Sequence, residues 1–337
     1  MDLTDNIRVV IAGAGSVGCY VGGILTADGV DVTFLGRDRL KQELSSHGLR
    51  ISDLTGFDQT IAPRQINFET DPHCLAGAQI ILVTVKSGAT EEMARLIGKY
   101  APNDAVIISL QNGVTNAGVI QEILGEHTVI PGMVPYNIVQ MGEGRFHRGT
   151  SGSIMIGTAI PHLDEMLSTP NLVVEGVDDM AGVLWGKLLI NLNNALNALS
   201  GIPLRDQFES HGWRKLLADQ MSEAMPLLKE AGITPKPAIG LSPKVAPHLM
   251  RLPTPIFKVI AGRMLKIDPK ARSSMWEDLQ GGRKTEIDQL QGSIVALAES
   301  LGQKAPLCER VYALIKDAEE KGQGSPSLTP MEIRKFS

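Results

Sequence analysis

The stretch VVIAGAGSVG, residues 9–18, decides the fold. It joins a short apolar run over 7–12, typical of a buried parallel strand, to a helical pattern over 16–28. Between them the glycines stand in G-x-G-x-x-G spacing, which is typical of the first strand–turn–helix unit of a doubly wound α/β sheet. We therefore expect the chain to open with such a sheet.

The glycine loop predicts a site for the pyrophosphate of a dinucleotide. Gly13 permits a tight turn, Gly15 lets the backbone approach the pyrophosphate, and Gly18 permits close packing of helix against strand. A helix N-terminus favours an anion, so Ser16 and Val17 are expected beside the phosphates as well.

Strand and helix signals continue to alternate through the first half of the chain. Such alternation predicts a parallel, Rossmann-type sheet. The strands are expected over 31–37, 78–86, 104–110 and 127–134, and the helices over 88–100 and 114–125. The glycine-rich stretch 142–157 is expected to form a strand pair at the edge of this sheet.

After about residue 175 helical patterns dominate. They cover 179–200, 211–231, 283–302 and 306–321, with a proline-rich stretch over 233–257 that predicts irregular or broken helix. The expected organisation is a dinucleotide-binding α/β domain over 1–177, an all-α substrate and catalytic domain over 178–325, and a loose tail over 326–337.

Composition narrows the class of protein. The 337 residues are 43% hydrophobic and 20% charged, with a net charge of -5, which argues against binding to nucleic acid or to an anionic membrane. Three widely spaced cysteines favour a reducing compartment, and the seven histidines show no metal-ligand spacing. The acidic start lacks the basic residues of a signal peptide, and no segment resembles a membrane span. We expect a cytoplasmic protein without a metal site.

Three polar positions follow predicted strands, at the sheet edge where α/β proteins bind ligands. Arg37 ends the second strand, where enzymes that use NAD usually carry an acid, and a guanidinium there favours the 2′-phosphate of NADPH. Asp38 and Arg39 follow it, and a solvated loop arginine is the alternative. Lys86 and Asn112 end two later strands and are expected to contact ligand, unless they are a surface charge and a turn residue.

The stretch WGKLLINLNNALNALSG, residues 185–201, carries polar side chains inside an apolar helix. On a helical wheel Lys187, Asn191 and Asn194 share one face, which could direct an ammonium and two amides into a cleft. Asn193 and Asn197 lie elsewhere, and a polar seam between two domains, or a helix whose far side is wet, explains them well. Farther along, the stretch 271–292 has helical surroundings, with Ser274 as an expected helix cap.

Together these motifs resemble the ketopantoate reductase (2-dehydropantoate 2-reductase) family. The shared features are the glycine loop, a lysine after VTV, LQNG, a K-x-x-x-N helix and SSM-x-x-D followed by TEID, in this order over nearly the whole chain. One position departs from the family pattern: Ala195 stands where the family commonly has a second asparagine, and Asn194 lies beside it.

The resemblance implies a role for each matching residue. It implies that Lys187 is the general acid, that Glu286 is its carboxylate partner, and that Asn191 and Ser274 contact substrate. Asn194 is expected to contact substrate in place of the missing asparagine. The resemblance further makes Asp278 a second carboxylate near the site, and Lys86 and Asn112 active-site or cofactor-side residues.

The resulting hypothesis is an NADPH-dependent reduction of ketopantoate to pantoate, on the route to pantothenate and coenzyme A. An ordinary lysine pKa of about 10.4 would keep Lys187 charged and able to protonate the oxyanion that hydride transfer leaves. The alternatives are a related reductase of another 2-keto acid, an opine-type dehydrogenase, and a nucleotide sensor without chemistry. Whether the chain forms a homodimer stays open.

Overall fold

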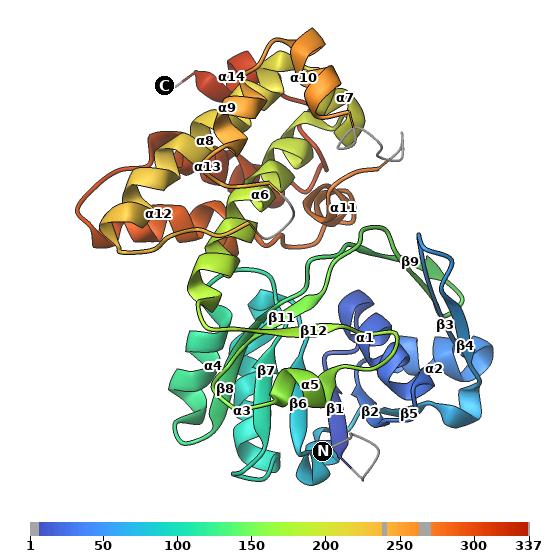
Figure 1. Cartoon of the computed structure of the whole chain (residues 1–337). Coiled ribbons are helices and arrows are strands. Elements are labelled where there is room, and N and C mark those ends of the chain that lie inside the picture. The colour runs from blue at the N-terminus through green and yellow to red at the C-terminus, as the bar shows by residue number, and fades with distance from the viewer. Residues whose placement is uncertain (1–6, 238–240, 263–270, 336–337) are drawn as a thin grey trace. The chain divides into compact units, whose positions relative to one another are not determined.

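The computed structural model describes residues 7–237, 241–262 and 271–335. Contacts divide the chain into two compact units, Met1–Met180 and Ala181–Ser337. The first is a mostly parallel α/β unit and the second is helical, as the sequence predicts (Figure 1). No helix among the described residues has the length and apolar character that crossing a membrane requires.

An eight-stranded sheet forms the centre of the first unit, in the order β12-β11-β8-β7-β6-β1-β2-β5. All neighbouring strands are parallel except β11 and β8. The strands are β1 (Arg8–Ala12), β2 (Asp31–Leu35), β5 (Asn67–Glu69), β6 (Ile80–Val83), β7 (Val106–Ser109), β8 (Thr128–Met133), β11 (Ile154–Gly157) and β12 (Val174–Val177). The segment β5-β2-β1-β6-β7-β8 has the Rossmann strand order.

The connections reverse direction between β1 and β6, and ligands of open α/β sheets bind at the carboxyl ends of the strands beside such a point. The helices that follow these strands are α1 (Ser16–Ala27), α2 (Asp38–His47), α3 (Thr90–Tyr100) and α4 (Asn116–Leu124), with the short α5 (Leu163–Leu167) before β12. The apolar runs of the strands are buried, and β1 is exposed only at Arg8.

A second sheet, in the order β4-β3-β10-β9, packs against α1. Its strands are β3 (Leu49–Asp53), β4 (Asp58–Ile61), β9 (Ile138–Gly142) and β10 (Arg145–Arg148). The expected strand pair within 142–157 is therefore wrong. β10 pairs with β3 and β9, whereas β11 joins the large sheet, because the link between them, with Gly149 and Gly152, passes from one sheet to the other.

The second unit is built around the long helix α6 (Met180–Ser200). The other helices are α7 (Leu204–Glu209), α8 (His211–Glu230), α9 (Ala246–Met250), α10 (Thr254–Ile260), α11 (Ser274–Gln280), α12 (Gln291–Ser300), α13 (Pro306–Lys321) and α14 (Pro330–Arg334). The proline-rich stretch yields only the short α9 and α10, as expected of broken helix. The helix expected over 283–302 begins at Gln291, after a 3-10 turn over Ile287–Gln289.

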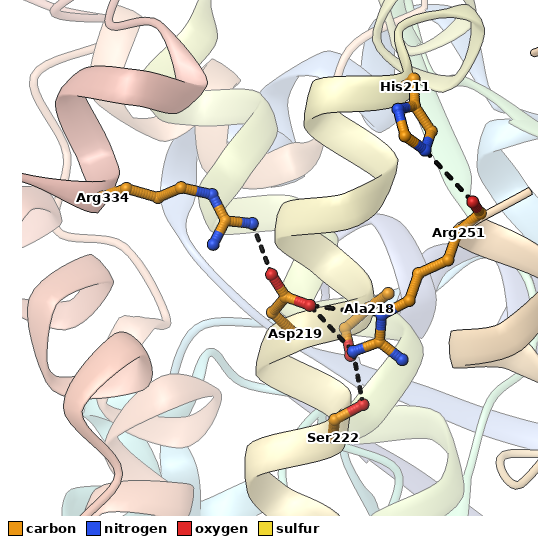
Figure 2. Close-up of polar contacts among 6 residues, drawn as sticks. All are labelled: His211, Ala218, Asp219, Ser222, Arg251 and Arg334. Carbon is orange, nitrogen blue, oxygen red and sulfur yellow. Dashed lines mark hydrogen bonds and ion pairs between the residues drawn. The ribbon is translucent and has the colours of Figure 1, made fainter. Parts of the chain in front are cut away.

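The C-terminal segment is ordered over 326–335, the part that the structure describes, which differs from the loose tail expected over 326–337. Thr329 caps α14 through a capping box with Glu332, and Ile333 is fully buried. Figure 2 shows Asp219 of α8 between two guanidinium groups, with Arg334 at 2.5 Å and Arg251 at 2.8 Å. Apolar burial and a charge-assisted hydrogen bond thus fix a segment whose composition alone suggests disorder.

Candidate active site

The glycine loop has the geometry of a phosphate-binding turn. Gly13 has φ +108°, and a Cβ there would lie 2.6 Å from the backbone nitrogen of Val85. A Cβ at Gly18 would lie 2.6 Å from Oγ1 of Thr84, so packing within the protein explains both glycines. Gly15 is different, because the nearest atom to its Cβ position, outside its chain neighbours, is 3.9 Å away. The space beside Gly15 at the start of α1 fits a bound pyrophosphate.

Arg37 lies at the end of β2 that faces this loop. It is exposed, with extended backbone, and serves as the N-cap position of α2. Within the described residues its side chain makes no hydrogen bond or ion pair with the protein. A guanidinium beside the first turn of a dinucleotide fold suits a 2′-phosphate, because Arg–phosphate pairs are charge-assisted.

Lys86 and Asn112 belong to neighbouring loops, after β6 and β7. Lys86 is exposed and directly precedes the 3-10 turn Ser87–Ala89. The Asn112 carbonyl accepts hydrogen bonds from Oγ of Ser87 at 3.3 Å and from Nδ2 of Asn116 at 2.5 Å. The structure therefore ties together the two loops that the sequence placed at one sheet edge.

A buried amide and hydroxyl network below these loops was missed by the sequence reading. Asn116 donates to Ser87 at 3.1 Å and accepts from Thr90 at 3.0 Å, while Gln111 donates to Thr90 at 2.7 Å and to the Val85 carbonyl at 3.0 Å. Thr90, Gln111 and Asn116 are each at most 6% exposed. The signal available in the sequence was the polar residue within LQNG, Gln111, and the polar residues that begin the two helices, Thr90 and Asn116.

In the second unit, two asparagines of α6 have structural partners. Nδ2 of Asn197 donates to the Ile202 carbonyl at 2.9 Å and to Oε1 of Gln207 at 3.0 Å. Nε2 of Gln207 donates to Oδ1 of Asn193 at 3.2 Å. The two asparagines are therefore structural, but they are buried within the helical unit rather than in a seam between domains or on a wet side of the helix.

The other two asparagines of the helix behave differently. Asn191 and Asn194 are partly buried, and in the described part of the chain their side-chain amides form no hydrogen bond. Buried amides are normally satisfied, so these two suit a ligand or water. The polarity of α6 is thus divided between a structural face and a face with open hydrogen-bonding capacity.

Lys187 lies on this second face, and its ammonium is perturbed. Burial lowers the pKa of Lys187 to about 8, and the negative charge of Glu286 partly opposes that effect. The expected ordinary lysine pKa is therefore wrong, because the sequence could not reveal how strongly packing desolvates this side chain. A pKa near the working pH is what a proton donor needs.

The segment that carries the two serines is attached to α6. The Ser273 amide donates to Oδ1 of Asn197 at 2.8 Å, and its hydroxyl donates to the Asn194 carbonyl at 3.0 Å. The N-cap of α11 is Ser273, whose oxygen accepts from the Trp276 amide at 3.2 Å, so the expected cap at Ser274 is wrong by one residue. Ser274, the residue after the one that contacts Asn194, is exposed.

Asp278 has a protein partner of its own. Its side chain is 5% exposed and accepts from Nε of Arg283 at 2.9 Å. This pair joins the end of α11 to the loop that leads to Glu286, which gives Asp278 a structural task besides any contact with substrate. Among the described residues, no cluster of three or more His, Cys, Asp or Glu side chains suits a metal ion.

Two family models match the chain. The model described as "Ketopantoate reductase PanE/ApbA" matches residues 9–160, and that of its C-terminal part matches residues 179–319. The chain belongs to the ketopantoate reductase family. It is accordingly an oxidoreductase with a Rossmann-type domain.

Full-length relatives agree with this assignment. A 2-dehydropantoate 2-reductase of Halobacterium salinarum is 26% identical and covers 94% of this chain and 100% of its own length. A solved PanE/ApbA family ketopantoate reductase from Ralstonia eutropha JMP134 is 29% identical with TM-score 0.80, over 94% of this chain and 100% of that one. A D-mandelate dehydrogenase solved with NADH and anilino(oxo)acetate is 20% identical with TM-score 0.76, over 94% and 99%.

Each unit of this ketopantoate reductase-family chain thus gathers its own part of the predicted site. The first unit brings the glycine loop beside the strand that precedes Lys86, and it ties the loop that carries Lys86 and Ser87 to Asn112. In the second unit the negative charge of Glu286 acts on Lys187, and the segment that carries Ser273 is attached to α6 at Asn194.

Proposed function

We propose that the protein reduces 2-dehydropantoate (ketopantoate) to pantoate with NADPH. The observation that carries the proposal is Lys187, a partly buried lysine on the polar face of α6 whose pKa is lowered to about 8 and which interacts electrostatically with Glu286. A nucleotide sensor without chemistry would need the glycine loop but not this acid and its partner.

NADPH fits the residues of the first unit. The open space at Gly15 and the first turn of α1, with Ser16 and Val17, would hold the pyrophosphate. Arg37 would pair with the 2′-phosphate, and Lys86 and Asn112 would lie toward the nicotinamide end, after β6 and β7. The bound cofactor supplies a hydride to the ketone carbon of the substrate.

The proton comes from the protein. Negative charge develops on the ketone oxygen as the carbonyl is reduced, and the Lys187 ammonium stabilises that oxygen and donates the proton from Nζ. With a pKa of about 8 the lysine is mostly protonated at neutral pH, yet it gives up a proton more readily than an ordinary lysine. Glu286 raises this pKa, so its charge keeps the acid loaded although the site is desolvated.

The amides and hydroxyl of the same unit would orient the substrate. Asn191, Asn194 and Ser274 offer donors and acceptors that suit a carboxylate and a terminal hydroxyl. Asp278, held by Arg283, would then support the Ser274 segment from the other end of α11.

The experiment is NADPH oxidation, followed at 340 nm, with ketopantoate, pyruvate, 2-ketoisovalerate and phenylglyoxylate at matched concentrations. We expect ketopantoate to have the highest kcat/KM. A site that hydrogen-bonds a substrate hydroxyl rejects analogues without it, because its buried polar groups are left unpaired. Faster reduction of pyruvate or 2-ketoisovalerate would overturn the substrate assignment and leave the reductase chemistry standing.

A related reductase of another 2-keto acid is the second candidate. Ala195 favours it, because this position is fully buried and apolar where the family commonly has an asparagine. A preference for phenylglyoxylate, which has no hydroxyl to bind, would establish this alternative.

A further inference from the structure

We propose that the segment 233–236, where it crosses α6 over Gly182 and Gly186, is a positioning element that holds Lys187 in its partly buried setting. The inference rests on the proposed role of Lys187 as the acid. It assigns a task to two glycines and to a segment that the reaction itself does not use.

The crossing is a close contact between backbones. A Cβ at Gly186 would lie 1.8 Å from the Lys236 carbonyl oxygen, 2.9 Å from its carbonyl carbon and 3.2 Å from its nitrogen. The Lys236 amide donates to the Gly182 carbonyl at 2.9 Å. No side chain larger than hydrogen fits at Gly186 unless the crossing segment moves.

The crossing segment is itself held at its start. It leaves the end of α8, where the Ile233 amide donates to the Leu228 carbonyl at 2.8 Å. Pro235 is buried and Pro237 is exposed, and the two prolines restrict the backbone on either side of Lys236. The segment is therefore stiff as well as close to α6.

Gly182 and Gly186 make α6 less stable than alanines at the same positions would. Gly182 and Gly186 are spaced i, i+4, so they lie on one face of α6, and glycine is unfavourable within helices. The Gly182 carbonyl is also the usual acceptor for the Gly186 amide, and here the Lys236 amide binds it as well. In return, the two glycines and the shared carbonyl allow the backbone of the crossing segment to pack directly on the turn of α6 before Lys187.

That packing accounts for the environment of the acid. Gly186 and Leu188, on either side of Lys187 in the sequence, are buried, and burial is the main cause of the lowered lysine pKa. The crossing segment carries one charged residue, Lys236, and the charge that acts on the pKa of Lys187 is that of Glu286, which raises it. The segment attached to α6 at Asn194 also carries Arg272, Glu277 and Asp278. Displacing the segment would admit water to this turn and return the lysine toward its ordinary pKa.

The test compares Gly186→Ala with Gly118→Ala. Gly118 is an exposed glycine of α4 whose Cβ position is open, so it controls for a glycine-to-alanine change within a helix. The readout is the rate at which trinitrobenzenesulfonate modifies Lys187, followed peptide by peptide by mass spectrometry across pH 6–11. This measurement needs no substrate. Steady-state kinetics and NADPH affinity are measured alongside.

We expect the pH midpoint for Lys187 modification to rise by about one pH unit or more, from about 8 toward 10.5, in Gly186→Ala and not in Gly118→Ala. We expect kcat to fall about tenfold, with NADPH affinity unchanged. If Gly186→Ala does not fold, Pro237→Gly loosens the segment at an exposed position and should shift the midpoint in the same direction.

A midpoint that stays at the wild-type value in a folded Gly186→Ala or Pro237→Gly protein would overturn the inference, as would a wild-type midpoint near 10.5. Failure of ketopantoate reduction with the midpoint shift intact would instead overturn only the proposed function.

Discussion

The pH dependence of reduction should expose Lys187 as the proton donor. Its pKa is lowered from 10.5 to about 8, chiefly by burial. In the proposed mechanism the protonated form is the active one, because it donates the proton. Activity is therefore full below this pKa and is lost as pH rises through it. With a pKa of about 8, roughly nine-tenths of the lysine is protonated at pH 7 and roughly one-tenth at pH 9. We expect kcat to fall about tenfold between these two pH values.

Two variants make this prediction specific. Glu286 raises the pKa of Lys187, so Glu286→Gln should move the descending limb to lower pH and lower kcat at pH 7. Glu299→Gln, at an exposed position of α12, removes the same charge away from Lys187 and should leave the limb in place.

The assay is the single-turnover rate of NADPH oxidation at saturating substrate, which avoids limitation by product release. A rate that stays constant from pH 7 to pH 9 in the wild-type protein would refute the reasoning. So would an identical shift of the limb in Glu286→Gln and Glu299→Gln.

The remaining predictions concern cofactor, acid and loop. Arg37→Asp should weaken NADPH binding ten- to a hundredfold and NADH binding little, since a charge-assisted pair is worth about 1.5–3 kcal/mol. Calorimetry with both cofactors checks this prediction, and equal losses of affinity for NADPH and NADH would contradict it. Lys187→Ala should lower kcat about a hundredfold or more while NADPH affinity stays within about twofold, and near-normal turnover would remove the lysine from the mechanism. Asn116→Ala breaks the buried network behind Asn112, so it should cost about 1–3 kcal/mol in urea unfolding and raise KM for NADPH, whereas Asn171→Ala, an exposed asparagine, should do neither.

Much of the fold follows from local sequence signals. The glycine loop after β1 and the alternation of apolar runs with helical patterns were enough to predict a Rossmann-type doubly wound sheet, because each β–α step is local in the chain. The second sheet was not predictable in this way. Arg148 of β10 lies opposite Asp53 of β3, 95 residues away, and nothing in either short strand specifies that partner.

In the candidate site, too, the features that depend on local spacing were predicted and those that depend on distant contacts were not. The helical wheel of 185–201 separated Lys187, Asn191 and Asn194 from the two structural asparagines, because position on a helix depends only on spacing. The cap of α11 depends on a distant contact. Either neighbouring serine could cap the helix, and Asn197 selects Ser273 by accepting its amide hydrogen. The pKa of Lys187 likewise depends on burial by packing, which no local pattern describes.

The perturbed lysine also has a consequence for stability. A lysine with an ordinary pKa when unfolded and a pKa of about 8 when folded disfavours the folded state wherever the lysine is protonated. This cost is fully present below about pH 8 and disappears as pH rises toward 10.5, reaching at most about 3 kcal/mol at ~1.36 kcal/mol per pKa unit. The glycines at 182 and 186 add a further cost to the same helix. Asn193 and Asn197, satisfied by Gln207, offset part of it on the opposite side. The polar residues inside α6 therefore have two different effects. One pair of amides stabilises the helical unit, whereas the lysine lowers its stability at the place where the proposed chemistry requires a desolvated proton donor.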